Sequence, residues 1–305
     1  MLDHARSAWR FVRDVVSDFT SDDCPALAAA ISYYTIFAMP PLLGLATLVA
    51  SVFVDPEAVR EIASEQVESV VGVESAAEIV DVVEGVTRPD LSGPTAVFGL
   101  GAILLGATGG FVHLQSALNK AWRVAPDPQG SNVRNFLMKR LISLAIMASI
   151  GLLLLTTLVL TTGLSAFEGL ITRYAPAWLE TSTLTALDIG TSFVIVTLAF
   201  TLVFKYIPDA VIRWRDAAVG GAVTGVLFTI GKQAIGYYLG RSDPATVYGA
   251  AGSLAVAMLW IYYSALILLL GAEFTERWAC RKGAPIVPQH GAVTVQRTFG
   301  EAHGS

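Results

Sequence analysis

The sequence predicts an all-α membrane protein, a bundle of six transmembrane helices with both termini in the cytoplasm. Composition is the first observation behind this fold class: 54% of the 305 residues are hydrophobic and 15% are charged, whereas a soluble domain carries roughly 25% charged residues. The second is that apolar residues fall in uncharged runs long enough to cross a hydrocarbon core of about 30 Å. The predicted spans cover residues 26–54, 94–113, 137–164, 184–206, 217–239 and 248–272, within a transmembrane domain of residues 23–282.

The distribution of lysine and arginine is the third observation, and it orients the spans. Basic residues concentrate in the N-terminal segment, in the loops after spans two and four, and in the C-terminal segment. Cytoplasmic loops of membrane proteins carry such an excess, so we expect a multi-pass protein of the cell (inner) membrane with N-in and C-in topology. The basic side comprises Arg6, Arg10, Arg13, Lys120, Arg123, Arg134, Lys139, Arg140, Lys205, Arg213, Arg215, Arg277, Arg281, Lys282 and Arg297, and the opposite loops hold Arg60, Arg88, Arg173 and Arg241.

Residues 1–22 predict an amphipathic helix ahead of the first span. Its apolar residues recur at alternating steps of three and four, which places them on one face of a helix. Such a helix suits the cytoplasmic membrane surface, with its tryptophan in the interfacial layer; packing of the same face on protein is the alternative. The apolar residues are Leu2, Ala5, Trp9, Val12, Val16 and Phe19, and the arginines Arg6, Arg10 and Arg13 lie elsewhere on the cylinder.

Two further segments lie outside the spans. Residues 55–92 form the largest predicted extracytoplasmic piece; Asp55-Pro56 is typical of a helix start, and the apolar periodicity predicts a helical hairpin with a break near Gly72. The polar face of this hairpin is acidic, which suits either a cap that concentrates cations or an ordinary solvated surface. Residues 283–305 are rich in glycine, proline and polar residues, so we expect a disordered cytoplasmic tail.

The first span contains an irregular position. Pro40 and Pro41 lie near its middle, and prolines inside a helix bend or break it, so we expect a bend or a helix break there. Tyr33 and Tyr34 precede these prolines, about 10 Å inside the cytoplasmic end of the span at 1.5 Å per residue. Discontinuous helices often build the binding sites of transporters.

Other polar groups lie inside or at the ends of the spans. Lys232 falls within span five, where a charge is costly unless it faces a partner or a cavity, or reaches the outer interface. Asn119 and Glu273 lie at the inner ends of spans two and six, where they stabilise the bundle or bind a substrate. The candidate substrate-binding residues are Tyr33, Tyr34, Asn119, Lys232, Tyr237, Tyr248 and Glu273.

Glycines four residues apart mark two expected helix contacts. Gly106 and Gly110 lie in span two, and Gly221 and Gly225 lie in span five. Glycines at this spacing let two backbones approach closely in a membrane. We therefore expect close helix packing at both pairs.

Several of these segments together resemble the YihY/BrkB family of membrane proteins. Residues 28–43 (AAAISYYTIFAMPPLL) are similar to the first helix of that family, and residues 117–122 (ALNKAW) to its motif after the second helix. Residues 213–217 (RWRDA) with Lys232 resemble its fifth-helix region, and residues 248–273 its last helix. The resemblance implies a six-helix inner-membrane protein. Members of the family have been labelled as ribonuclease BN, as a serum-resistance virulence factor and as transporters.

The residues themselves argue against catalysis. Metal-dependent hydrolysis of RNA needs clustered histidines and carboxylates, but His4, His113, His290 and His303 are dispersed. The sequence has no basic, aromatic-rich domain for RNA and no phosphate-binding glycine motif of the nucleotide-hydrolysing type. We therefore expect no enzyme activity, no metal or other cofactor, and no nucleic-acid partner.

Transport is the function that we expect instead. The proline-containing first span, the polar side chains inside the bundle and a lysine suited to an anionic group all favour it. The expected partners are the lipid bilayer and a small solute, an ion or a lipid head group. The alternative is a non-transporting envelope scaffold that recruits partners through the outer loop 55–92. The sequence leaves the oligomeric state open.

Overall fold

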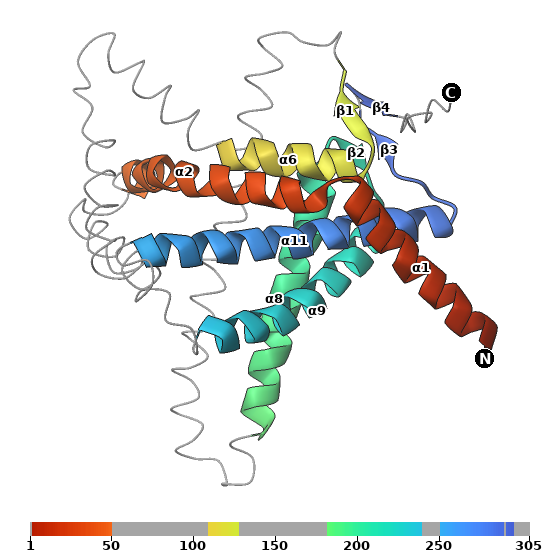
Figure 1. Ribbon diagram of the computed structural model, residues 1–305, viewed down its shortest axis with the longest axis horizontal. Coiled ribbons are helices and arrows are strands. Elements are labelled where there is room, and N and C mark those ends of the chain that lie inside the picture. Colours follow the sequence, from red (N-terminus) through yellow and green to blue (C-terminus); the bar gives the residue numbers. More distant parts are fainter. Residues whose placement is uncertain (1, 51–108, 128–181, 240–250, 290, 296–305) are drawn as a thin grey trace, which may run out of the picture. The chain divides into compact units, whose positions relative to one another are not determined.

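The protein is mostly helical in the computed structural model, which describes residues 2–50, 109–127, 182–239, 251–289 and 291–295 (Figure 1). These residues form six helices and four short strands. The helices are α1 (Leu2–Ser21), α2 (Cys24–Ala50), α6 (Gly109–Ala121), α8 (Ser182–Tyr206), α9 (Trp214–Leu239) and α11 (Ala251–Arg281). The strands are β1 (Val124–Pro126), β2 (Ala210–Val211), β3 (Val287–Pro288) and β4 (Ala292–Thr294).

The chain divides into two compact units, which we describe separately. The first unit contains Met1–Asp22, Gln115–Val226 and Leu270–Ser305, and the second contains Asp23–Leu114 and Leu227–Leu269. Helix α1 belongs to the first unit and α2 to the second, whereas α11 contributes its C-terminal part to the first unit and its N-terminal part to the second.

Helices α9 and α11 are long and apolar enough to cross a membrane, in Trp214–Ile235 and Leu254–Arg281 respectively. Shorter apolar stretches occupy Cys24–Met39 of α2 and Phe193–Tyr206 of α8. The predicted helices at 1–22, 184–206 and 217–239 are confirmed within a few residues. Spans 94–108 and 137–164, and the acidic loop 55–92, lie outside the described residues.

Helix α2 is not broken at its prolines. It runs without interruption from Cys24 to Ala50 and therefore through Pro40 and Pro41, so a break at the prolines is wrong, whereas a bend there stays a prediction. An internal proline removes one hydrogen-bond donor and crowds the preceding turn. Transmembrane helices tolerate this loss because local adjustments satisfy the released backbone groups. The proline pair alone did not decide between a break and a continuous helix.

The segment after α11 is not wholly disordered, which corrects the expectation for residues 283–305. Strand β4 pairs with β1 in antiparallel register, Val124 opposite Thr294, and β3 pairs with β2, Val211 opposite Val287 (Figure 1). The pairing partners come from the loops that follow α6 and α8. Local composition does not reveal such non-local pairing. Residues 296–305 lie outside the described residues.

In the first unit, α9 and α11 fit together through two reciprocal glycine–threonine contacts. A Cβ atom added to Gly220 would lie 1.9 Å from Thr275 Oγ1, and one added to Gly271 would lie 1.9 Å from Thr224 Oγ1. Each threonine is fully buried and donates to the carbonyl oxygen four residues earlier in its own helix, Thr224 to Gly220 and Thr275 to Gly271. The two helices approach closely because each glycine leaves room for the threonine of the other helix.

The neighbouring glycines of α9 contact α8. A Cβ atom on Gly221 would lie 2.8 Å from the Thr197 carbonyl oxygen and 2.9 Å from the Thr201 nitrogen, and one on Gly225 would lie 2.8 Å from Thr197 Oγ1. The close contact expected at Gly221 and Gly225 is therefore confirmed. In the second unit, a Cβ atom on Gly110 would lie 2.9 Å from Thr35 Oγ1, while Gly106 lies outside the described residues.

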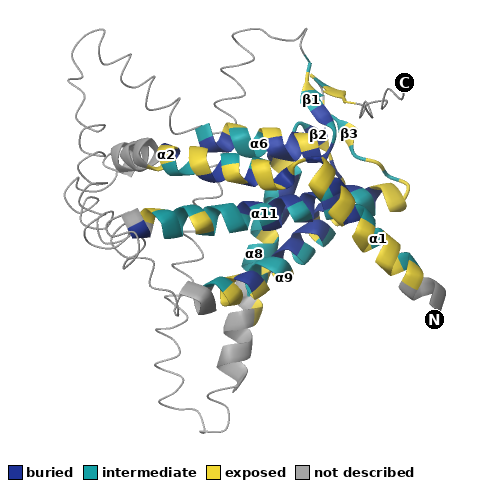
Figure 2. Ribbon diagram, in the orientation of Figure 1, coloured by how far each residue is buried: buried dark blue, intermediate teal, exposed yellow. Residues whose placement is uncertain are grey.

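Burial rises toward the C-terminal part of α11 (Figure 2). Residues 254–264 are exposed or partly exposed, whereas Leu269, Ala272 and Thr275 are almost completely buried. Helix α11 also extends to Arg281, nine residues beyond the predicted end of the span at 272. This extension carries charged residues into the buried part of the first unit.

Candidate functional site

Four carboxyl groups of the first unit are buried together at the end of α1 and along the last turns of α11. Asp18, Asp22, Glu273 and Glu276 have exposed fractions of 2%, 6%, 0% and 7%; we call them the acidic cluster. Asp18 belongs to α1, and Asp22 follows its last residue, Ser21. Carboxylates are rarely buried unless they are paired. Their partners therefore determine what the cluster can do.

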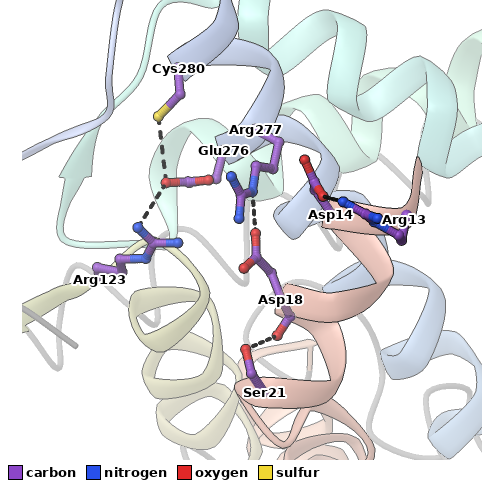
Figure 3. Close-up of polar contacts among 8 residues, drawn as sticks. All are labelled: Arg13, Asp14, Asp18, Ser21, Arg123, Glu276, Arg277 and Cys280. Carbon is purple, nitrogen blue, oxygen red and sulfur yellow. Dashed lines mark hydrogen bonds and ion pairs between the residues drawn. The ribbon is translucent and has the colours of Figure 1, made fainter. Parts of the chain in front are cut away.

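Two arginines face the acidic cluster from different elements (Figure 3). Arg277 of α11 donates from Nε to Asp18 Oδ2 in a hydrogen-bonded ion pair. Arg123 Nη1 lies 3.8 Å from Glu276 Oε1, and the Cys280 thiol donates to the same oxygen over 3.5 Å. These contacts join the end of α1, the segment after α6 and the end of α11 into one charged network.

Local backbone geometry places Arg123. Its φ of 56° lies in the left-handed region, which is uncommon outside glycine and often ends a helix. The Arg123 amide bonds back to Lys120 over 3.1 Å, and the chain then enters β1. The Val295 amide of the C-terminal segment donates to the Arg123 carbonyl oxygen over 2.8 Å. This hydrogen bond, beside the pairing of β1 with β4, thus helps to fix the backbone of Arg123, which pairs with Glu276.

The Glu273 carboxyl is fully buried close to the carboxyl groups of Asp22, Asp18 and Glu276. Burial and neighbouring negative charge both favour the protonated form of a carboxyl group. Carboxyl groups held close together in a buried site repel one another when all are ionised, and a proton shared between Asp22 and Glu273 would lower this repulsion.

Among the buried atoms of the network that lack a hydrogen-bond partner in the described part of the chain are Arg123 Nε, a donor, and Glu276 Oε2, an acceptor. Buried polar atoms without partners are rare, and they are explained by strain, by a functional role, or by a bound water or ion. The network therefore retains hydrogen-bonding capacity of both kinds.

Further hydrogen bonds connect elements of the first unit. Asn119 Nδ2 donates to Asp209 Oδ2 over 3.0 Å, and the Asp209 amide donates to Asn119 Oδ1 over 2.8 Å. The indole of Trp122 donates to the Ala272 carbonyl oxygen over 3.0 Å. Through these bonds, α6 is held against α11 and against the segment after α8. Within the described residues, no group of three or more histidine, cysteine or acidic side chains is arranged to hold a metal ion.

The sequence-predicted site residues do not all lie in one unit. Asn119 and Glu273 lie in the first unit, and Glu273 is a member of the acidic cluster. Tyr33, Tyr34 and Lys232 lie in the second unit, where all three are exposed. Tyr34 stacks on His113 with ring centroids 3.5 Å apart. Tyr237 lies near the end of α9, and Tyr248 lies outside the described residues.

Sequence reasoning missed Asp18, Asp22, Glu276 and Arg277. Asp18 and Asp22 are four residues apart, as neighbours on one helical face are, and this face is opposite the predicted apolar face of α1. Glu273 and Glu276 are three residues apart in a segment that the span prediction excluded. Both spacings are visible in the sequence, but the sequence does not show that these two pairs of carboxyl groups come together in the fold.

Comparison with known proteins places the chain in a family. The family model described as virulence factor BrkB matches residues 15–292. A protein of Rhodospirillum centenum named UPF0761 membrane protein is 29% identical over 293 residues, which cover 94% of this chain and 62% of that protein. One of Legionella pneumophila with the same family name is 28% identical over 270 residues, covering 87% of this chain and 61% of the relative.

The chain thus spans less than two thirds of the length of these relatives. A shorter match, to a UPF0761 membrane protein of Ralstonia nicotianae, is 42% identical over 76 residues, or 25% of this chain and 17% of the relative. No solved structure matches the chain. The relatives are named as membrane proteins, in agreement with the two long apolar helices, and the family model covers most of the sequence. The chain belongs to the virulence factor BrkB family of membrane proteins.

Proposed function

We propose that this chain forms part of a transporter or permeability protein for a small solute, an ion or a lipid, and that the acidic cluster takes part in its function. The observation that carries the proposal is the buried network in the last turns of an apolar, membrane-length helix, with Arg123 Nε and Glu276 Oε2 unpaired. Charged groups inside membrane segments are costly and mark ion and substrate pathways. We infer no enzymatic step.

The proposal includes the topology expected from the sequence. The chain crosses the cell membrane six times with both termini in the cytoplasm, and the acidic cluster then lies near the cytoplasmic side. The arginines of the network, Arg123 and Arg277, belong to the segments with excess positive charge, which supports this orientation. Labelling of single introduced cysteines from either side of sealed vesicles tests it.

A proton is the first cargo to measure, because the Glu273 carboxyl is fully buried beside other carboxyl groups, and buried carboxyls of this kind serve as proton relays. Purified protein is reconstituted into liposomes that contain a pH-sensitive dye. A pH difference is imposed across the membrane, and an ionophore for another ion compensates the charge that protons carry. We expect the internal pH to relax faster than in protein-free liposomes. We expect Glu273→Gln, which cannot ionise, to slow the relaxation to the protein-free rate.

The matched control is Asp14→Asn. Asp14 lies on the same helix as Asp18 but pairs with Arg13 on the surface, where the two side chains are 44% and 68% exposed. It should relax as fast as the unaltered protein. Equal rates for the unaltered protein, Glu273→Gln and protein-free liposomes would refute proton movement through this chain. A fast rate that persists in Glu273→Gln would remove the acidic cluster from the pathway.

The second unit is tested with a panel of radiolabelled anionic solutes and lipids. Lys232→Met and Tyr34→Phe remove the ammonium and hydroxyl groups that the sequence suggests for substrate binding. We expect at least one flux to fall in these variants while the protein remains folded. If every flux is unchanged, these residues are not part of the site.

A further inference from the structure

Helix α1 has two faces of different character, and three residues of the apolar face predicted from the sequence are exposed. Trp9, Val12 and Val16 are exposed by 70%, 53% and 50%. At 100° per residue they fall within about 60° of one another around the helix. These three residues, which we call the lipid face of α1, remain uncovered by the described part of the chain (Figure 2).

The opposite face of α1 is attached to α11. Phe11 packs edge-on against Phe274 with ring centroids 5.3 Å apart, and Ser7 Oγ accepts a hydrogen bond of 2.7 Å from Arg281. Asp18 pairs with Arg277 further along. Because these contacts come from one side of α1, they fix which side faces outward. Within the described part of the chain, no protein contact covers Trp9, Val12 or Val16.

The charge beside the lipid face identifies its occupant. Arg6, Arg10 and Arg13 are exposed and lie next to the lipid face, about 40–100° further around the helix from Trp9. Thr20 adds no unsatisfied polar group nearby, since its hydroxyl donates to the Val16 carbonyl oxygen over 2.9 Å. An apolar stripe with an adjacent row of arginines matches the boundary between acyl chains and anionic head groups.

We propose that the lipid face of α1 docks on the surface of an anionic phospholipid bilayer. Trp9, Val12 and Val16 enter the head-group and acyl boundary, and Arg6, Arg10 and Arg13 contact lipid phosphates. Helix α1 thus lies along the membrane surface. The surface of a second copy or of a soluble partner would not require a row of cations beside an apolar stripe. This inference is independent of the transport proposal, because docking requires no flux.

The test uses the full chain in liposomes of phosphatidylcholine with phosphatidylglycerol. A nitroxide spin label is attached to Val12→Cys or Val16→Cys, in a Cys280→Ala background that leaves only the buried Cys24. Collisions with oxygen, which concentrates in the bilayer, are compared with collisions with a water-soluble nickel chelate. Ser17→Cys is the matched control, because Ser17 is exposed but lies 100° around the helix from Val16.

We expect oxygen collisions to exceed nickel collisions at positions 12 and 16, with the reverse at position 17. In the Arg6→Gln/Arg10→Gln/Arg13→Gln protein, the labels at positions 12 and 16 should lie less deep in the anionic bilayer, so that oxygen collisions fall relative to nickel collisions. Nickel-dominated collisions at all three positions would overturn the proposal. An immobilised label at 12 and 16 that neither reagent reaches would also overturn it, because it would indicate a protein partner or a second copy. Equal depths with and without the arginines would refute the role of anionic lipid.

Discussion

The contacts inside the first unit of this protein differ in kind from the contacts inside the second. In the first unit, ion pairs and hydrogen bonds join distant elements, such as Asp18 with Arg277 and Asn119 with Asp209. In the second, the described contacts are mainly apolar and aromatic, with Phe228 against Trp260 and Tyr34 against His113, and the Ser32 hydroxyl donates to the Met258 carbonyl oxygen over 2.7 Å. The first unit thus adds buried charge pairing to close helix packing, whereas packing contacts predominate among the described residues of the second.

Helix α11 contributes to both units and changes character between them. Residues 254–269 contain no charged side chain, whereas residues 270–281 contain Glu273, Glu276, Arg277 and Arg281. A buried charge is tolerated only where opposite charge or a shared proton compensates it. The charged turns of α11 are therefore confined to the part where α1 and the segment after α6 supply the compensation.

The largest effect should come from filling the close backbone contact between α8 and α9 in the first unit. A side chain at Gly221 would collide with backbone atoms of Thr197 and Thr201, which cannot rotate away, and overpacking typically costs 1–3 kcal/mol or more. We expect Gly221→Val to yield little folded, monodisperse protein in size-exclusion chromatography. Gly190→Ala in α8, where nothing lies within 4 Å of the added atom, should be tolerated. A well-folded Gly221→Val protein would show that α8 and α9 do not pack as described.

The next effect tests the charge pairing. Arg277→Gln leaves the carboxylate of Asp18 buried at 3% exposure without its cation, and breaking such a pair costs about 3 kcal/mol. We expect a lower free energy of unfolding in mixed micelles. The exposed pair provides the control: Arg13→Gln should change stability by less than about 1 kcal/mol. Similar values for the two variants would contradict the distinction between buried and surface pairs.

A smaller change is expected for the polar contact of the second unit. Ser32→Ala removes the donor to the Met258 carbonyl oxygen, and one hydrogen bond contributes about 1 kcal/mol net. Ser116→Ala, at an exposed position of α6, serves as the control for the substitution. A loss for Ser32→Ala as large as that for Arg277→Gln would mean that the second unit also depends on polar contacts.

The smallest change in stability, but a specific spectroscopic one, should follow Glu273→Gln. The amide is nearly isosteric and can donate to Asp22, so the fold should persist. Infrared spectroscopy of the unaltered protein near neutral pH should contain the carbonyl stretch of a protonated carboxyl group in a dry site. That band should vanish in Glu273→Gln and remain in Asp14→Asn. A band that survives in Glu273→Gln would assign the proton to another group.

The sequence predicted the elements better than the contacts. Apolar runs located α8 and α9, and the glycines at 221 and 225 were correctly expected at a close helix contact, because both signals are local. The partners of Asp18 could not be predicted, since Arg277 is 259 residues away along the chain. The pairing of β3 with β2 and of β4 with β1 could not be predicted either, because strands of two or three residues have no detectable periodicity. Glu273 was singled out, but its neighbours depend on an extension of α11 that hydropathy does not predict.

The strand pairing also constrains the order in which the protein can be completed during synthesis. Strands β1 and β2 follow α6 and α8, but their partners β4 and β3 come after α11. A nascent chain therefore inserts its helices while β1 and β2 still lack partners, and these strands can pair only after the ribosome has passed α11. The Arg123 carbonyl receives its bond from Val295 at the same late stage. The ribosome must therefore have translated the chain through Val295 before the backbone contacts around the charged network can be complete.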